Sequence, residues 1–338
     1  MDFEPHPLLR NAHAMTLAGL LPRRIFGSHF STLPQGETKR VRVDEETELL
    51  VVMHRQLNRS DAPLAVLVHG LSGSADSHYM RGLGAKLFAR GFHVARMNVR
   101  NCGGSEALTP TLYCTAQSGD VYTAARGARE FFGAQRVYVC GWSMGGNMAL
   151  KFAAELGDEA PDWLRSVAAV SPALDLEAAQ VALDDVRSNK IYRRFFLKDM
   201  LKLLRRKEIR FPQRYQSRGL ERIDTFLEWD EVVTAPHFGF ANAQDFYQRA
   251  ASRPILPRIR VPVCVVHAVD DPFVPFAPWS DPRTRPAGGF TFFGPRFGGH
   301  CGFIAASRAE DSDRYWAEQR VAEFFAREEE LALMPSTP

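Results

Sequence analysis

Residues 137–147 constrain the fold more than any other segment of the chain. They read Val-Tyr-Val-Cys-Gly-Trp-Ser-Met-Gly-Gly-Asn: an apolar strand, a Gly-x-Ser-x-Gly turn and the start of a helix. A serine at such a turn is held in a strained conformation, with its hydroxyl above the edge of a sheet. Glycines flank it because side chains there would clash with neighbouring backbone. The segment therefore predicts an α/β fold in which Ser143 stands exposed at the end of a strand.

Short apolar runs alternate with helix-like segments along most of the chain. Strands are expected at 49–53, 64–69, 93–99, 136–140, 166–170 and 263–267, and helices at 80–90, 119–132, 144–156 and 316–333. Buried strands that alternate with helices form a mostly parallel sheet with helices on both faces. From 171 to 260 the sequence predicts helices but no strand. We expect one domain over residues 1–338, with residues 171–260 forming an inserted helical lid.

Composition excludes several classes of protein. Of the 338 residues, 45% are hydrophobic and 24% are charged, which is the balance of a folded globular chain and not of a disordered one. No apolar run reaches the ~18 residues of a membrane-spanning helix. Lys and Arg number 42 against 39 Asp and Glu, a net charge of only +3. A nucleic-acid-binding protein usually carries a much larger positive excess, so no nucleic-acid partner is expected.

The cysteines and the first residues predict a cytoplasmic location. Five cysteines occur without any Cys-x-x-Cys pair, so neither a disulfide framework nor a structural zinc site is expected. Cys140 and Cys264 lie within apolar runs, where a thiol behaves as a small hydrophobic group. The chain begins Met-Asp-Phe-Glu, which is acidic where a signal peptide is basic.

The most basic stretch of the chain, residues 187–210, falls within the expected lid. It predicts a helix whose apolar residues, at positions 191, 195, 196, 200, 203 and 204, share one face while basic residues cover the rest. In one interpretation this helix packs on the main domain and its basic face is simply solvated. In the other, the basic face meets anionic lipid or an acidic substrate.

A serine hydroxyl needs a base and an orienting carboxylate to become a nucleophile. On this kind of fold they follow the serine in the order Asp or Glu, then His. Asp270 and Asp271 follow the strand expected at 263–267, and His300 lies further on in a glycine-flanked loop. We predict Ser143 as nucleophile and His300 as base. The spacing Asp-x-x-x-Pro, common at this turn, favours Asp271 as the orienting acid, with Asp270 as the alternative.

Two backbone amides are expected to bind the oxyanion that forms during acyl transfer. One is the N–H of Met144, directly after the nucleophile. The other is the N–H of Leu71, in the loop that follows the strand at 64–69. His267 and His237 are expected to have structural roles, although His237 lies in the lid, where substrate contact is an alternative.

Several motifs extend over nearly the whole chain. They are Asn11-x-His13-x-x-Thr16, His69-Gly70-Leu71-x-Gly73-Ser74, Asn98-x-Arg100-x-Cys102, Gly141-x-Ser143-x-Gly145-Gly146-Asn147-Met148, Phe226-x-x-x-Asp230 with Thr234-Ala235, Ala268-x-Asp270-Asp271-Pro272-Phe273 and Gly298-Gly299-His300-x-Gly302-Phe303. With them the chain resembles the YheT-like group of α/β-hydrolases, which is related to ABHD1/ABHD3-type hydrolases. It departs from that group at 100–104 and 113–116, so substrate preference follows less directly than mechanism.

The resemblance implies hydrolysis of acyl esters with no cofactor and no metal. We therefore predict a serine hydrolase that cleaves small-molecule carboxylic esters through an acyl-enzyme. A thioesterase, an acyltransferase or a lipid-directed (phospho)lipase would use the same residues and remain alternatives. A non-catalytic binding protein on the same fold is a more remote one, because such a protein should have lost a member of the Ser143, Asp271 and His300 set.

Overall fold

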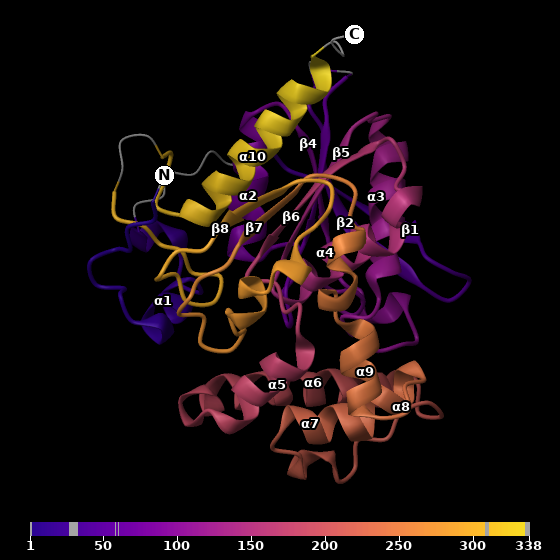
Figure 1. The fold of residues 1–338 in the computed structure, drawn as a ribbon. Helices are drawn as coiled ribbons and strands as arrows, with labels where there is room; N and C mark the ends of the chain where they lie inside the picture. Colours follow the sequence, from indigo (N-terminus) through magenta and orange to yellow (C-terminus); the bar gives the residue numbers. More distant parts are fainter. Residues whose placement is uncertain (1, 27–32, 58, 60, 308–310, 335–338) are drawn as a thin grey trace.

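An eight-stranded sheet forms the centre of the computed structural model, which describes residues 2–26, 33–57, 59, 61–307 and 311–334 (Figure 1). The strand order is β1-β2-β4-β3-β5-β6-β7-β8. β2 runs antiparallel to both β1 and β4, and the other neighbours are parallel. The strands are β1 (Glu37–Arg42), β2 (Glu48–His54), β3 (Leu64–Val68), β4 (His93–Met97), β5 (Val137–Trp142), β6 (Leu164–Val170), β7 (Val263–Val266) and β8 (Phe290–Phe293). The mostly parallel sheet predicted from the sequence is confirmed.

Helices cover both faces of this sheet. α2 and α10 pack together on one face, and α3 and α4 pack together on the other. The helices are α1 (Ala12–Ala18), α2 (His78–Ala89), α3 (Ser118–Phe132), α4 (Met144–Leu156), α5 (Leu176–Asp185), α6 (Lys190–Arg210), α7 (Phe226–Trp229), α8 (Ala235–Phe238), α9 (Ala243–Ala250) and α10 (Trp316–Leu333).

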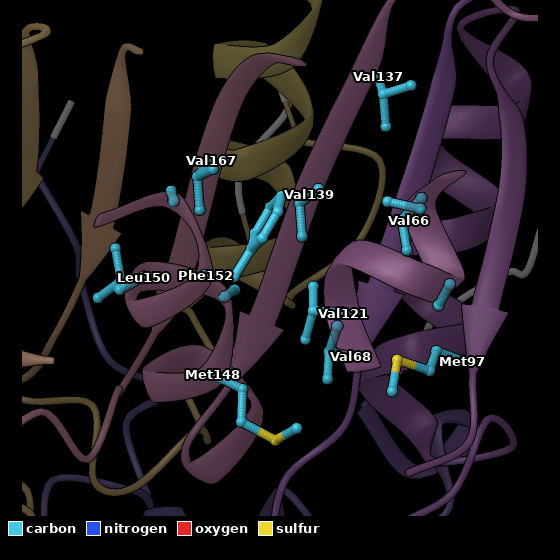
Figure 2. Close-up of a cluster of buried hydrophobic side chains, with 14 of the residues drawn as sticks. Val66, Val68, Met97, Val121, Val137, Val139, Met148, Leu150, Phe152 and Val167 are labelled. Atoms are coloured by element: carbon cyan, nitrogen blue, oxygen red, sulfur yellow. The ribbon is translucent and has the colours of Figure 1, made fainter. Parts of the chain in front are cut away.

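The central strands are apolar on both faces because both are buried. Successive residues of a strand point to opposite sides, so Val137 and Val139 belong to the core under α3 and α4. Tyr138 and Cys140 belong to the core under α2 and α10. Figure 2 shows part of the first core, with Val139 beside Phe152 of α4. A strand buried in this way has little freedom to slip, which fixes the position of the turn at its end.

β1, like β8, is a strand that the sequence prediction missed. Its sequence is Glu-Thr-Lys-Arg-Val-Arg, and most of its residues are exposed or half-buried. It pairs with β2 at the edge of the sheet. Charged residues are common on edge strands, where they discourage pairing with other chains. The strand therefore lacks the apolar run that marked its neighbours.

Residues 171–262, between β6 and β7, contain helices and turns and no strand; all of these residues are described. We refer to them as the helical insertion. It holds α5 to α9, which Figure 1 shows gathered beyond one end of the sheet, apart from the helices on its faces. β5 and β6 are parallel, so the chain leaves both at the same edge of the sheet. The insertion thus begins at the edge where the turn at Ser143 lies.

The predicted face of α6 is wrong in part. Ile191 and Phe195 are 65% and 62% exposed, whereas Leu204 is buried. At about 100° per residue, Phe195 lies about 180° from Leu204, so the apolar residues do not form one stripe. Nor do basic residues cover only the solvent side. Arg193 and Lys207 are buried, because each donates hydrogen bonds to backbone carbonyls.

Candidate active site

Ser143 lies on a strained turn between β5 and α4, with φ 52° and ψ −119°. The turn is possible because neighbouring positions lack side chains. A Cβ at Gly145 would overlap the carbonyl oxygen of His69, and a Cβ at Gly141 would overlap that of Gly145. At Gly70 it would lie 3.1 Å from the Cβ of Ser143. The strained serine expected from the sequence is therefore present, with the β3 and β5 turns packed closely against it.

Three predicted side chains meet at this turn. The Nε2 atom of His300 lies 2.9 Å from Ser143 Oγ, and its Nδ1 atom lies 2.8 Å from Asp271 Oδ2. A carboxylate only accepts hydrogen bonds, so Nδ1 carries a proton, and in the neutral imidazole Nε2 accepts from the serine hydroxyl. This is the arrangement in which a histidine can remove the serine proton.

The adjacent carboxylates of Asp270 and Asp271 do different things. Asp271 accepts hydrogen bonds from the amides of Phe273 and Val274 on Oδ1, which leaves Oδ2 facing His300. Asp270 instead accepts from the amide of Gly299, 2.9 Å away, in the loop that carries the histidine. The structure thus brings Asp271, not Asp270, to the imidazole.

The environment of His300 favours its charged form. Burial alone lowers the pKa of the imidazole, but the charge of Asp271, the neighbouring Cys301 and the hydrogen bond to Asp271 outweigh burial and raise the pKa above its usual 6.5. The ring of Phe273 lies against the imidazole, with centroids 4.1 Å apart. An imidazolium formed during a reaction would therefore be stabilised by a neighbouring negative charge and shielded from water.

The loop of His300 is held by a residue whose role the sequence prediction missed. Thr16, in α1, donates to the carbonyl of Ala12 and accepts from the amide of His300, at 2.7 and 2.9 Å. A Cβ at Gly299 would lie 2.6 Å from the same Ala12 oxygen. Thr16 stands in one of the motifs quoted above, but nothing in the sequence connects it to a loop almost three hundred positions away.

The amides of Leu71 and Met144 flank the serine. Among the described residues neither amide donates to another protein group. The Leu71 loop is fixed by His69, whose Nε2 accepts from the amide of Val99 and whose Nδ1 donates to the carbonyl of Gly70. Burial lowers the pKa of His69 to about 4, so this ring stays neutral and keeps that arrangement. Two backbone donors are thereby available beside Ser143.

A mainly apolar pocket of about 840 Å³, part of it open to solvent, begins at Ser143. One wall comes from the edge of the sheet and includes Leu71, Met144 and Thr115. The other wall comes from the helical insertion: Leu176, Ala179, Leu183, Phe196, Met200, Phe226, Asp230, Thr234, Phe246 and Tyr247. An apolar chain attached to a group at Ser143 could be buried there.

The other two histidines considered above have structural partners. His267 is fully buried, and its Nε2 lies 3.0 Å from the carbonyl of Val274. His237 contacts the carbonyl of Val233 at 2.8 Å and stacks on Tyr215. Within the described ranges no group of three or more His, Cys, Asp or Glu side chains is arranged to hold a metal ion.

Comparison with known proteins identifies the family. The family described as alpha/beta hydrolase fold matches residues 63–287, which is more than half of the chain. The chain belongs to the α/β-hydrolase family. Among solved structures, Est1E from Butyrivibrio proteoclasticus is similar, with a TM-score of 0.55 and 14% identity. That match covers 87% of this chain and 99% of Est1E, and it supports the fold alone.

Three relatives are similar in sequence. The putative esterase YheT of Escherichia coli is 28% identical over 264 residues, which are 78% of this α/β-hydrolase and 76% of YheT. The medium-chain fatty acid ethyl ester synthase/esterase 2 of Saccharomyces cerevisiae is 27% identical, with coverage of 90% and 70%. The phospholipase ABHD3 of Homo sapiens is 23% identical, with coverage of 73% and 60%. The resemblance to the YheT-like group is confirmed.

The close packing at Gly145 leads to a stability prediction. Gly145→Ala should lower the free energy of unfolding by about 1–3 kcal/mol, the usual effect of overpacking, because the added methyl meets the His69 carbonyl. Gly119→Ala is the matched control, since a Cβ there meets nothing within 4 Å. It should be neutral or stabilise by up to about 1 kcal/mol. Urea denaturation of both variants measures the difference, and equal stabilities would contradict the geometry of the turn.

Proposed function

We propose that this α/β-hydrolase cleaves carboxylic esters of small acyl substrates through an acyl-enzyme, with Ser143, His300 and Asp271 as its catalytic triad. The observation that carries the proposal is the pair of contacts of His300, with Ser143 on one nitrogen and Asp271 on the other. These contacts lie at the mouth of an apolar pocket and beside two amides that donate to no protein group in the described part of the chain. The relatives named as esterases support the same activity.

The proposed reaction has two stages. Ser143 Oγ attacks the ester carbonyl while His300 Nε2 takes its proton, and the amides of Leu71 and Met144 bind the oxyanion. The carbon–oxygen bond to the alcohol breaks, and the alcohol leaves with the proton from Nε2. Water then gives a proton to Nε2 and attacks the acyl-enzyme, which releases the acid and returns the proton to Ser143. Asp271 balances the charge of the imidazolium in both stages.

The pocket favours an apolar acyl group or an apolar alcohol. The helical insertion supplies most of its apolar wall, and we propose that the insertion acts as the lid of the site. Burying each methylene of a chain in such a pocket contributes about 0.8 kcal/mol, so activity should rise with chain length until the pocket is full. No cofactor or metal enters the proposed reaction. A cytoplasmic location remains a prediction that rests on the cysteine pattern.

Acyl transfer to an alcohol is the second candidate, because the yeast relative is named as an ethyl ester synthase as well as an esterase. A lipid-directed (phospho)lipase and a thioesterase would use the same residues, and one relative is named as a phospholipase. Paired oxygen and thiol esters, assayed with and without added ethanol, separate these reactions. A binding protein without activity is disfavoured by the complete contacts of His300.

A chain-length series of p-nitrophenyl esters tests the activity. The wild type should hydrolyse them at rates that depend on acyl length, and Ser143→Ala should fall to the background rate because no nucleophile remains. Release of p-nitrophenol at neutral pH gives kcat/KM for each ester. Flat rates that are equal in both proteins would end the esterase proposal.

The pKa of His300 predicts the pH profile. The base must be neutral to accept a proton, so kcat/KM should rise with pH through an apparent pKa above 6.5. Asp271→Asn removes the charge that raises this pKa. The rise of kcat/KM should therefore move to lower pH, while kcat falls by about 10⁴-fold. The matched control is Asp270→Asn, whose carboxylate accepts from Gly299 rather than His300. A larger loss of kcat in Asp270→Asn than in Asp271→Asn would contradict the choice of Asp271 as the orienting acid. So would a pH profile of kcat/KM that Asp271→Asn does not shift.

The helical insertion also offers a surface suited to a lipid interface. On α6 the exposed Ile191 and Phe195 share a side of the helix, since they are four residues apart. Exposed basic residues of the same helix surround them: Lys190, Arg194, Lys198, Lys202, Arg205 and Arg206. Apolar side chains set among cations are typical of helices that lie on anionic membranes. None of the described helices is long and apolar enough to cross a membrane. We propose peripheral contact through residues 187–210.

Vesicle co-sedimentation tests this contact. The wild type should bind vesicles that contain phosphatidylserine more tightly than pure phosphatidylcholine, and added salt should weaken binding. The double substitution Ile191→Ser and Phe195→Ser should release most of the bound protein. Leu57→Ser is the control, because Leu57 is 88% exposed and lies outside the insertion. Absence of binding by the wild type, or undiminished binding by the double variant, would contradict the proposal.

A further inference from the structure

A polar cluster interrupts the apolar wall that the helical insertion gives to the pocket. Asp230 and Thr234 are the ends of a π-helical turn (Asp230–Thr234) between α7 and α8, and Tyr247 lies on α9. All three residues line the pocket that begins at Ser143. π-Helical turns are rare and are often found at functional sites. The cluster is therefore part of the cavity that the substrate would enter.

The hydrogen bonds within the cluster leave it with acceptors only. Thr234 donates its hydroxyl proton to Asp230 Oδ1 at 2.6 Å, and Tyr247 donates to Oδ2 at 2.9 Å. Both hydroxyl protons are thereby used. A carboxylate can accept about four hydrogen bonds, so lone pairs remain on its oxygens and on the two hydroxyl oxygens. The chemical complement of such a cluster is a hydrogen-bond donor.

The carboxyl group lies in an environment that penalises its charge. Asp230 is 7% exposed, and in the described residues no Lys, Arg or His side chain forms an ion pair with it. Burial raises its pKa to about 6, although the hydrogen bonds from Thr234 and Tyr247 oppose that rise. A further donor would lower the cost of burying this group. An ammonium group would itself have to lose its hydration on entering an apolar pocket, so a neutral hydroxyl fits better.

We infer that Asp230, Thr234 and Tyr247 form a subsite that accepts a hydrogen bond from a hydroxyl group of the substrate, remote from the ester that reacts at Ser143. The inference rests on the proposed ester hydrolysis and specifies its substrates as hydroxyl-bearing esters. The hydroxyl belongs either to the acyl chain or to the alcohol, and the chemistry of recognition is the same for both. Asp230 is thus a specificity-determining residue, since it contacts substrate without taking part in bond cleavage.

Matched pairs of esters test the subsite. In the acyl arm, p-nitrophenyl esters of chain-terminal hydroxy acids are compared with unsubstituted acids of equal length. In the alcohol arm, hydroxyalkyl esters of one acid are compared with the corresponding alkyl esters. The measured quantity is the ratio of kcat/KM within each pair. A hydrogen bond to a charged acceptor should give the wild type a preference of about tenfold or more for the hydroxyl-bearing member, in the arm whose hydroxyl reaches the cluster.

Three variants separate recognition from mere support of the insertion. Asp230→Asn keeps the size of the side chain but replaces an acceptor by a donor, so the ratio should fall severalfold. Tyr247→Phe gives a second measure that remains available if Asp230→Asn folds poorly. It removes one acceptor oxygen and the hydrogen bond that orients the carboxylate, so the ratio should fall there too. Glu231→Gln is the matched control, because Glu231 lies in the same π-helical turn, accepts from the amide of Ala243 and does not line the pocket. It should lower Tm and leave the ratio unchanged.

Each result bears on one of the two proposals. Wild-type ratios near one in both arms would overturn the subsite while the ester hydrolysis stands. The same holds for ratios that Asp230→Asn and Tyr247→Phe do not change, and for an equal fall in Glu231→Gln. Failure of the wild type to hydrolyse any ester, or equal rates in Ser143→Ala, would overturn the proposed function and the subsite with it.

Discussion

The strained backbone at Ser143 is the constraint on which the rest of the site depends. A φ of 52° at a residue with a side chain costs of order 1–3 kcal/mol and persists only where the surroundings enforce it. Here the enforcement comes from a buried strand before the turn, a buried helix after it and glycines that admit the backbone of the neighbouring turn. The same contacts set the amides of Met144 and Leu71 beside the hydroxyl. The proposed nucleophile and the proposed oxyanion donors are therefore positioned by the same packing.

The remaining groups reach the serine from distant parts of the chain. Asp271 follows β7, His300 follows β8, and α1 holds the histidine loop through Thr16. The pocket wall comes from the insertion between β6 and β7. The loops that follow β3, β5, β6, β7 and β8 begin at the same edge of the sheet, because these five strands are parallel. The parallel sheet thus gathers separate loops into one site, and the insertion forms a wall of the pocket beside it.

The sequence predicted the elements whose signal is local. The bounds of α4 and α10 agree with prediction, and Ser143, Asp271 and His300 could be chosen because strand ends, glycines and chain order mark them. What it missed depends on tertiary contacts. Thr16 meets His300 only after folding, and β1 is a polar edge strand. The face of α6 was assigned wrongly because its apolar residues lie in two different environments. Leu204 is buried in a hydrophobic core, whereas Phe195 is exposed to solvent. The sequence shows an aspartate at position 230, but it does not show that this residue lines a pocket.

We propose that this packing activates Ser143 as a nucleophile. A fluorophosphonate probe reacts with a serine that a histidine activates and spares ordinary serines, so peptide mass spectrometry after labelling tests the claim directly. We expect one phosphonylated peptide, modified at Ser143, in the folded wild type and none in Ser143→Ala. Labelling that maps to another residue, or that persists in Ser143→Ala, would contradict it.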